Sequence, residues 1–239
     1  VYTPFWNMVK TRDVDAPLPT PAKIKAPDAW PQSDALESWQ MGAVMNRGAD
    51  VVRPFVRLGE HAAQDRLALL IENIVADYKT TRDLPGTDGT SNLSENLALG
   101  EISPHQCWHA GKRGLEEGKQ GAEIFLKELV WREVAYHLAH HTPHIVDRNW
   151  KEGWDAFPWN TDDTAEVIAW KQGRTGVPFV DAAMREMYIS GTMHNRGRMI
   201  VASYLTKHLM THWKVGQAWF ADCLTDWDPA SNALGWQGA

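Results

Sequence analysis

The sequence predicts an all-α fold, and three observations support this prediction. Apolar residues recur at the three-and-four spacing of one buried helix face, most clearly over residues 67–78. Signals that start and stop helices accompany this pattern, and neither a run of alternating strands nor an internal repeat interrupts it. With 239 residues and 44% apolar content, the chain is long enough for one large domain with a sizeable core.

From the N-terminus, the chain divides into three parts. Residues 1–11 open with the β-prone run VYTPFW, for which we expect a short strand. Residues 12–33 are rich in proline and predict a linker without regular structure. Residues 34–239 predict the helical body.

Within the body, the helical period is repeated several times. Further helices are expected over residues 124–141, 178–190, 195–213 and 217–224. Ser103, Pro104 and Gln106 combine an N-cap serine, a proline at the first helical position and the glutamine of a capping box. Gly191 has the position of a residue that ends a helix.

Composition excludes several classes of protein. Lys plus Arg number 24 against 30 Asp plus Glu, and the net charge of -6 excludes a globally basic nucleic-acid binder but not a local basic patch. Two cysteines without CxxC spacing fit neither a disulfide scaffold nor a structural zinc site, so we expect a reducing, cytoplasmic setting. No apolar run approaches the roughly 20 residues of a membrane-spanning helix, and we expect a soluble protein.

Residues 84–94, LPGTDGTSNLS, form a glycine- and hydroxyl-rich stretch between two helical segments. Its backbone amides and hydroxyl groups are suited to holding an anion. The alternative is a surface turn in which Asn92 and Glu95 cap the following helix, and the residues alone favour this turn. The stretch contains neither a Walker motif nor GxGxxG.

Residues 193–214 form a positive island in an acidic chain. They carry Arg196, Arg198, Lys207 and Lys214 and no Asp or Glu, which suits contact with phosphates. The common alternative is a solvated helix face. The cluster MHNRGRM at a helix start favours a binding role.

No metal site and no hydrolase are predicted. Asp226 and Asp228 flank Trp227, but no His or Glu cluster with ligand spacing lies near them. Four histidines follow one another with Glu133 close by, in an order that is not HExxH, and we interpret them as surface or capping residues: His137, His140, His141 and His144. No GxSxG elbow is present.

Seven strings, in order along the chain, resemble the photolyase and cryptochrome family, specifically the FAD-binding domain of class I cyclobutane pyrimidine dimer DNA photolyases. The strings are VYTPFW, DYKTTRDLPGTDGTSNLS, LALGEISPHQCW, KELVWREVAYHL, AWKQGRTGVPFVDAAMREM, MHNRGRMIVASYLTKHLM and DWDPASNALGWQ. The resemblance implies a multi-helix domain around FAD, which in its reduced anionic form donates an electron on illumination and splits a flipped-out pyrimidine dimer in DNA. It also implies that residues 1–11 are a remnant of an α/β antenna domain, that no antenna chromophore binds this chain, and that the protein is a monomer.

The resemblance carries specific residues with it. Phosphates and ribityl chain of FAD are expected at Tyr78, Thr90, Ser91, Asn92, Leu93 and Ser94. Arg198 would pair with Asp226 beside the flavin ring, Asp228 would lie at the ring edge, and Asn232 would face flavin N5. Signalling cryptochromes often carry Asp or Cys at this last position, so the asparagine favours a photolyase.

Substrate residues follow in the same way. The lesion is expected to meet Glu128, Trp131, Arg132, Asn195, Arg196 and Met199: Glu128 at the thymine carbonyl edge, Trp131 stacked on the dimer, and Arg132 near the phosphates. The sister family that repairs 6-4 photoproducts has a histidine pair where Asn195 and Met199 stand, which favours the dimer-splitting enzymes.

The resemblance also gives a use to three of the 13 tryptophans. Trp236, Trp213 and Trp159 match an indole relay that carries electrons to the flavin. Asn92 and His105 replace family arginines, and the chain ends GWQGA where the family continues into further helices, so we expect a C-terminally truncated domain. Two alternatives remain: a cryptochrome-like blue-light photoreceptor without repair activity, and a helical DNA-binding remnant without flavin.

Overall fold

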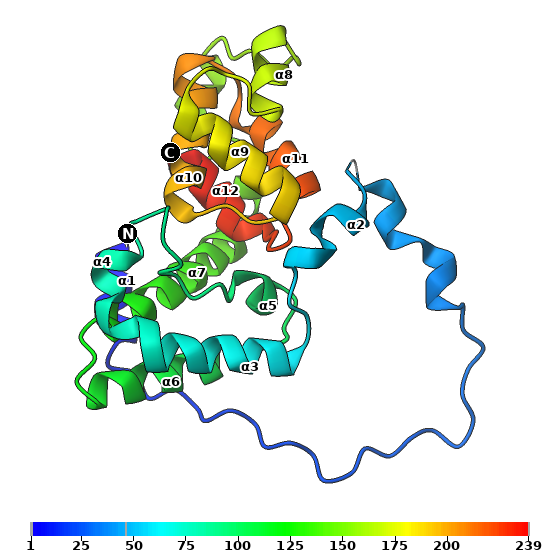
Figure 1. The fold of residues 1–239 in the computed structure, drawn as a ribbon, viewed down its shortest axis with the longest axis vertical. Helices are drawn as coiled ribbons and strands as arrows, with labels where there is room; N and C mark the ends of the chain where they lie inside the picture. Colours follow the sequence, from blue (N-terminus) through cyan, green and yellow to red (C-terminus); the bar gives the residue numbers. More distant parts are fainter. Residues whose placement is uncertain (1, 46, 239) are drawn as a thin grey trace.

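The structure, a computed structural model, describes residues 2–45 and 47–238. Twelve α-helices make up this part of the chain, which contains no β-strand (Figure 1), so the all-α prediction is confirmed. The helices are α1 (Tyr2–Val9), α2 (Ala49–Val52), α3 (Glu60–Leu69), α4 (Tyr78–Thr81), α5 (Ser94–Ala98), α6 (Pro104–Glu116), α7 (Ala122–His141), α8 (Ala165–Lys171), α9 (Pro178–Ser190), α10 (Asn195–Ser203), α11 (Trp213–Cys223) and α12 (Pro229–Gly238). No helix in these ranges is long and apolar enough to cross a membrane.

One group of helices consists of α1 and α3 to α7 and encloses the first core. The helical path of α3 continues through a π turn (Leu70–Ile74) and a 3-10 turn (Val75–Asp77) into α4. Leu70, Ile71, Val75 and Tyr78 are buried along it, as the three-and-four spacing predicts. They pack against Phe125, Leu126 and Val130 of α7, the 20-residue helix that crosses the molecule.

The strand expected in residues 1–11 is wrong, because Tyr2–Val9 is an α-helix. Tyr2, Phe5, Trp6 and Val9 have the spacing of one helix face, and all four pack against the first core. Pro4 lies in the first turn, where a missing N–H group costs no hydrogen bond. Tertiary packing on α7 therefore overrides the local β preference. Val1, also part of that prediction, lies outside the described residues.

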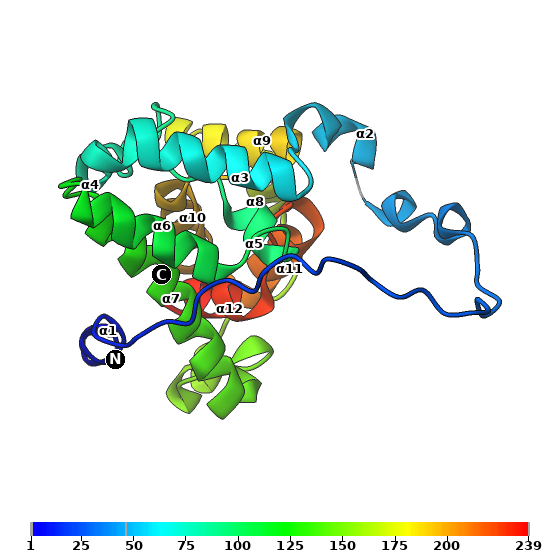
Figure 2. The same ribbon diagram turned by 90° about the horizontal axis from the view of Figure 1, so that it is seen from below.

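Residues 12–33 contain no helix and no strand and run along the outside of the molecule. Figures 1 and 2 show this segment leaving α1, passing below α6 and swinging wide before the chain returns through α2. Leu18, Ile24 and Trp30 are almost fully exposed on it. The segment contributes little to the core, which lies in the helices after it.

The second group, α8 to α12, has a core of its own around Trp170, Phe220 and Trp236. The helices expected over 124–141 and 178–190 are confirmed as α7 and α9, and Gly191 ends α9 with a left-handed φ of 79°. The capping box of α6 is also confirmed, since the Ser103 hydroxyl accepts a hydrogen bond from the Gln106 N–H group. The predicted helix 217–224 is α11, which begins earlier, at Trp213.

The expected helix 195–213 is not continuous. It begins at Asn195 as predicted, passes into a π turn (Tyr204–His208), and breaks before Trp213. Met210 has a φ of 48°, and the buried Thr211 forms an isolated bridge with Asn160. This contact with a segment distant in sequence has no local signal, and it redirects the chain so that α11 packs beside α12.

Candidate functional site

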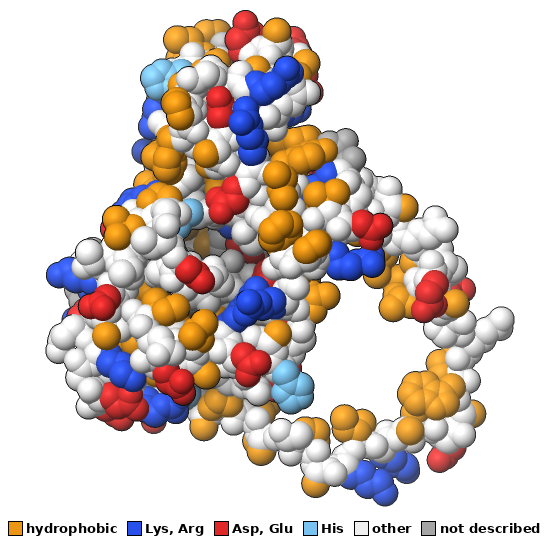
Figure 3. Space-filling model, in the orientation of Figure 1, with side chains coloured by type: hydrophobic (Ala, Val, Ile, Leu, Met, Phe, Trp, Pro, Cys, Tyr) orange, Lys and Arg blue, Asp and Glu red, His pale blue; other side chains and the backbone are white. Residues whose placement is uncertain are grey.

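A cavity of about 1500 Å³ lies between the two helix groups. It is larger than the roughly 300 to 1,000 Å³ typical of pockets for small ligands. Figure 3 shows the surface hollowed where the upper and lower groups meet. Most of the residues expected in the cofactor and substrate sites line it: Tyr78, Thr90, Ser91, Asn92, Ser94, Glu128, Trp131, Arg132, Asn195, Arg196, Arg198, Met199, Asp226, Asp228, Asn232 and Trp236. Leu93 does not, because its side chain is fully buried in the first core.

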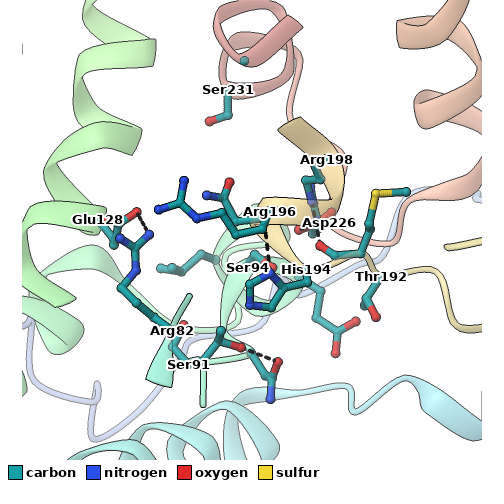
Figure 4. Close-up of a pocket in the computed structure, with 18 of the residues that line it drawn as sticks. Arg82, Ser91, Ser94, Glu128, Thr192, His194, Arg196, Arg198, Asp226 and Ser231 are labelled. Atoms are coloured by element: carbon teal, nitrogen blue, oxygen red, sulfur yellow. Dashed lines mark hydrogen bonds and ion pairs between the residues drawn. The ribbon is translucent and has the colours of Figure 1, made fainter. Parts of the chain in front are cut away.

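The buried end of the cavity, which we call the floor, is formed by Arg198, Asp226, Asp228 and Asn232. Arg198 of α10 donates from Nη2 to Asp226 Oδ2 at 2.7 Å (Figure 4), and its Nε bonds the Met193 carbonyl. The second oxygen, Asp226 Oδ1, is buried and has no hydrogen-bond partner among the described residues. A buried carboxylate oxygen without a partner is costly, so this atom indicates a ligand that donates a hydrogen bond.

Asp228 and Asn232 are set by the start of α12. Asp228 Oδ1 accepts from the N–H groups of Ala230 and Ser231 and so caps the helix, while Oδ2 accepts from the Tyr136 hydroxyl at 2.5 Å. Asn232 donates from Nδ2 to the Asp228 carbonyl one turn earlier. Asp228 is thus fully bonded within the protein, and the amide oxygen of Asn232 is the atom left for a ligand.

Hydroxyl groups line the wall opposite α10. Thr90 and Ser91 line the cavity from the loop before α5, and Ser94 lines it from the first position of that helix. The loop folds tightly, with Asn92 at a φ of 52°. The Asn92 amide bonds Asp88 and accepts from the Thr90 hydroxyl. The alternative in which Asn92 and Glu95 form a capping pair is wrong, because α5 has no side-chain cap.

Glu95 instead joins three segments below that loop. It forms a buried ion pair with Arg66 of α3 and accepts from the Thr225 hydroxyl, next to Asp226. The loop and the floor are therefore held together by one carboxylate. This arrangement stiffens the wall on which the hydroxyl groups lie.

The open end of the cavity, which we call the mouth, is formed by Arg82, Asp83, Glu128, Trp131 and Arg196. Arg82 Nη2 lies 3.0 Å from Glu128 Oε2 (Figure 4), and Arg196 makes a two-point contact with Asp83 at 3.0 and 2.9 Å. Burial raises the pKa of Glu128, and the neighbouring Arg82 only partly offsets this. Burial, followed by the charge of Glu128, also raises the pKa of Tyr78.

Aromatic and apolar groups complete the mouth. Trp131 is 43% exposed although it lines the cavity, and Asn195 and Met199 are exposed beside it on the first turns of α10. Arg132 lies 4.6 Å from the centroid of the Tyr136 ring and pairs with Glu133. An exposed indole at a cavity edge offers a flat surface on which a base can stack.

The structure places the three tryptophans expected in the relay at different depths. Trp236 lines the cavity and is buried, and it packs so tightly on α11 that a Cβ at Gly216 would collide with it. Trp213, at the start of the same helix, is buried and donates from its indole to Asn149. Trp159 is half-buried, with the His212 ring between it and Trp213 at centroid distances of 5.9 and 5.5 Å.

Sequence reasoning missed the ionic partners at the mouth. Arg82 and Asp83 lie in the quoted string DYKTTRDLPGTDGTSNLS, but nothing in the string shows that they pair with Glu128 and Arg196. Tyr136, which holds Asp228, was missed as well; its place two turns after Glu128 on α7 was the available signal. Within the described ranges, no three His, Cys, Asp or Glu side chains are placed to hold a metal ion.

Comparison with known sequences gives one consistent result. The family model of the FAD-binding domain of DNA photolyase matches residues 125–239. Curated proteins named deoxyribodipyrimidine photo-lyase are 45% identical over 99% of this chain (Agrobacterium fabrum, 50% of the relative) and 41% identical over 75% of it (Escherichia coli, 39% of the relative). The chain spans about half the length of the first of these relatives.

Solved structures agree with the sequences. A class III photolyase from Agrobacterium tumefaciens superposes with a TM-score of 0.92 and 44% identity, covering 99% of this chain and 49% of that one. A Synechocystis cryptochrome superposes with a TM-score of 0.72 and 35% identity, covering 77% of this chain and 39% of the cryptochrome. The expected class I is not confirmed, because the Agrobacterium structure is described as class III.

FAD is the cofactor of the matched domain, and the residues present fit it. The unpartnered Asp226 Oδ1 suits a donor on a polar ring, the hydroxyl groups of Thr90, Ser91 and Ser94 suit phosphates, and the cavity volume suits a ligand with two ring systems. The chain belongs to the photolyase and cryptochrome family and carries its helical FAD-binding domain.

Proposed function

We propose that this chain repairs DNA in light by splitting cyclobutane pyrimidine dimers. One observation supports this most strongly: a single cavity joins a floor suited to a flavin with a mouth that offers an exposed indole, a partly buried carboxyl and two arginines. The mouth offers groups that can stack on a base and contact phosphates, which flavin photoreduction alone does not require. The names of the relatives, deoxyribodipyrimidine photo-lyase, support repair over signalling.

The protein's task at the floor is to hold and orient FAD. Arg198 and Asp226 would fix the ring, with Asp226 Oδ1 accepting from it, and Asn232 would lie against its N5 edge with Asp228 behind. Tyr78 and the hydroxyl groups of residues 90–94 would bind the phosphates and ribityl chain. In its reduced anionic form, bound FAD supplies, on absorbing light, the electron that splits the dimer.

At the mouth, the protein's task is to receive two linked neighbouring pyrimidines from one strand of damaged DNA. Enzymes that act on bases take them out of the helix, and a distorted dimer costs less to extrude than an intact pair. Trp131 would stack on the extruded dimer. Burial raises the pKa of Glu128 and so favours the protonated carboxyl, which would donate to a thymine carbonyl. Asn195 and Met199 would line the edge, while Arg132 and Arg196 would contact phosphates.

The tryptophan path serves a different step. Trp236, Trp213 and Trp159 would conduct electrons from the surface to the cavity, which prepares the reduced state that repair requires. This proposal is supported by the close rings of Trp159, His212 and Trp213 at the outer part of the path and by the packing of Trp236 on α11, the helix that Trp213 begins. Repair that starts from chemically reduced protein therefore does not depend on them.

The deciding experiment measures repair directly. The chain, loaded with FAD and reduced with dithionite, is illuminated at blue wavelengths with an oligonucleotide that contains one thymine dimer, and restored thymine is followed by chromatography. We expect restoration in light and none in darkness. A 6-4 photoproduct in the same oligonucleotide is the matched control and stays unrepaired. A chain that binds FAD and photoreduces it, yet leaves the thymine dimer intact, is a photoreceptor and contradicts the proposal.

A further inference from the structure

Tyr2, at the start of α1, stacks on Trp131. The two ring centroids are 3.9 Å apart and the ring planes differ by 11°. The Tyr2 hydroxyl donates to the Lys127 carbonyl at 2.8 Å, one turn before Trp131 on α7. Tyr2 thus contacts both the ring of Trp131 and the backbone that carries it.

The two rings face different surroundings. Trp131 lines the cavity, whereas Tyr2 is absent from its lining. Tyr2 therefore covers the side of the indole that faces away from the cavity, and the other side stays open at the mouth. Burial, followed by the charge of Glu128, raises the pKa of Tyr2 to about 12, which keeps its hydroxyl protonated as a donor.

The helix that carries Tyr2 is firmly attached. Trp6 is buried in the first core with the Lys127 ammonium 5.4 Å from its ring centroid, and Phe5 packs on His137 with 5.5 Å between centroids. Tyr2 is therefore a fixed surface for Trp131. An exposed indole without such a backing samples several rotamers. A ligand that stacks on it must restrict the indole to one rotamer, and the lost entropy weakens binding.

We propose that Tyr2 is a positioning residue for recognition of the lesion: it holds Trp131 in the orientation in which its open face stacks on an extruded pyrimidine dimer. The inference rests on the proposed function, because it assigns Trp131 to the damaged base. It adds a residue of α1, distant in sequence from Trp131, to the substrate site. The three rings, Tyr2, Trp131 and the dimer, would form one stack.

The test compares three variants with the wild type by affinity for an oligonucleotide with a thymine dimer and for the same oligonucleotide without damage. Y2L removes the stack, and Y2F keeps the ring and loses the hydroxyl. F5L removes one contact of α1, the Phe5 ring on His137, while the buried Trp6 and the Tyr2 hydroxyl bond keep the helix docked. Aromatic pairs contribute enough to change affinity about 3- to 10-fold. We expect Y2L to weaken binding of damaged DNA by this factor, with undamaged DNA and FAD content unchanged, and Y2F and F5L to stay within about twofold of wild type.

A double-mutant cycle shows whether Tyr2 acts through Trp131. In a W131L background, we expect Y2L to cause no further loss of affinity for damaged DNA. A second readout is independent of DNA: in protein labelled with 5-fluorotryptophan, the ¹⁹F resonance of Trp131, assigned with W131F, is expected to shift and broaden in Y2L and to keep its position in F5L.

The outcomes separate this inference from the proposed function. Wild-type protein that binds both oligonucleotides equally overturns the proposed function and the role of Tyr2 with it. Wild-type protein that prefers the lesion, with Y2L unchanged in affinity, overturns the role of Tyr2 alone. An equal loss of affinity in Y2L and F5L also overturns it, because the effect then comes from the docking of α1.

Discussion

The floor and the mouth of the cavity hold their ion pairs in different ways. At the floor, the Asp226 side chain is 4% exposed and pairs with Arg198, whose other bonds also lie within the protein. At the mouth, Arg196 and Asp83 are 41% and 43% exposed. A buried pair cannot lose one member without leaving an uncompensated charge. A half-exposed pair contributes little to folding stability, and its members can change partners readily. The floor suits a cofactor that stays bound, and the mouth suits the exchange of ionic partners that the proposed binding of DNA requires.

The largest expected effect is at the floor. Asp226→Ala leaves Arg198 without its partner, and breaking a buried pair costs about 3 to 5 kcal/mol. We expect loss of both FAD and stability, measured by flavin absorbance after gel filtration and by urea unfolding. Asp83→Ala at the mouth is the matched control and keeps its FAD. Full flavin occupancy in Asp226→Ala would place the cofactor contact elsewhere.

The next effect separates the path below the floor from repair itself. Trp213→Phe keeps a smaller aromatic ring, so folding survives at a cost of about 1 to 3 kcal/mol, but phenylalanine is far harder to oxidise than indole. We expect blue-light reduction of the oxidised flavin band to slow sharply, with FAD content and repair by dithionite-reduced protein unchanged. Undiminished photoreduction would show that another route carries the electron. Lost repair in the reduced variant would show that Trp213 supports the substrate site.

A smaller effect is expected at the mouth, where Asp83 would compete with the proposed DNA substrate for Arg196. Asp83→Asn removes the competing charge, and a half-exposed pair contributes up to about 1 kcal/mol, so affinity should rise up to about fivefold. We expect the affinity for damaged and for undamaged DNA to rise alike, because the contact is to phosphate. Arg196→Ala is the reciprocal variant and lowers the logarithmic salt slope by about one unit. Weaker binding in Asp83→Asn would mean that Asp83 orients Arg196 and does not mask it.

The contrast between floor and mouth also shows what the sequence could predict. Helices α7 and α9 were predicted within two residues because apolar period and caps are local signals. Helix α1 was missed because its conformation is decided by packing on α7, and the break after residue 208 because the bridge from Asn160 to Thr211 is not local. The floor pair of Arg198 and Asp226 followed from a resemblance in motifs. The contact between Asp83 and Arg196 joins residues 113 positions apart, and no sequence pattern predicts it.

The smallest effect tests whether the pair of Glu128 and Arg82 resembles the exchangeable pair at the mouth or the fixed pair at the floor. Its pKa is raised chiefly by burial, so the folded state holds its proton more tightly than the unfolded chain does. Ionisation therefore costs stability: the fold is most stable below the pKa of the unfolded glutamate, and stability is lost as pH rises through the higher pKa of the folded state.

Glu128→Gln removes this cost. We expect it to melt above wild type at pH 7 and close to it at pH 4, with weaker binding of the lesion. Glu133→Gln on the same helix, an exposed partner of Arg132, is the control and changes stability little at either pH. A Glu128→Gln protein that melts below wild type at pH 7 would mean that attraction to Arg82 outweighs burial, and that this pair is a fixed structural element like the pair at the floor.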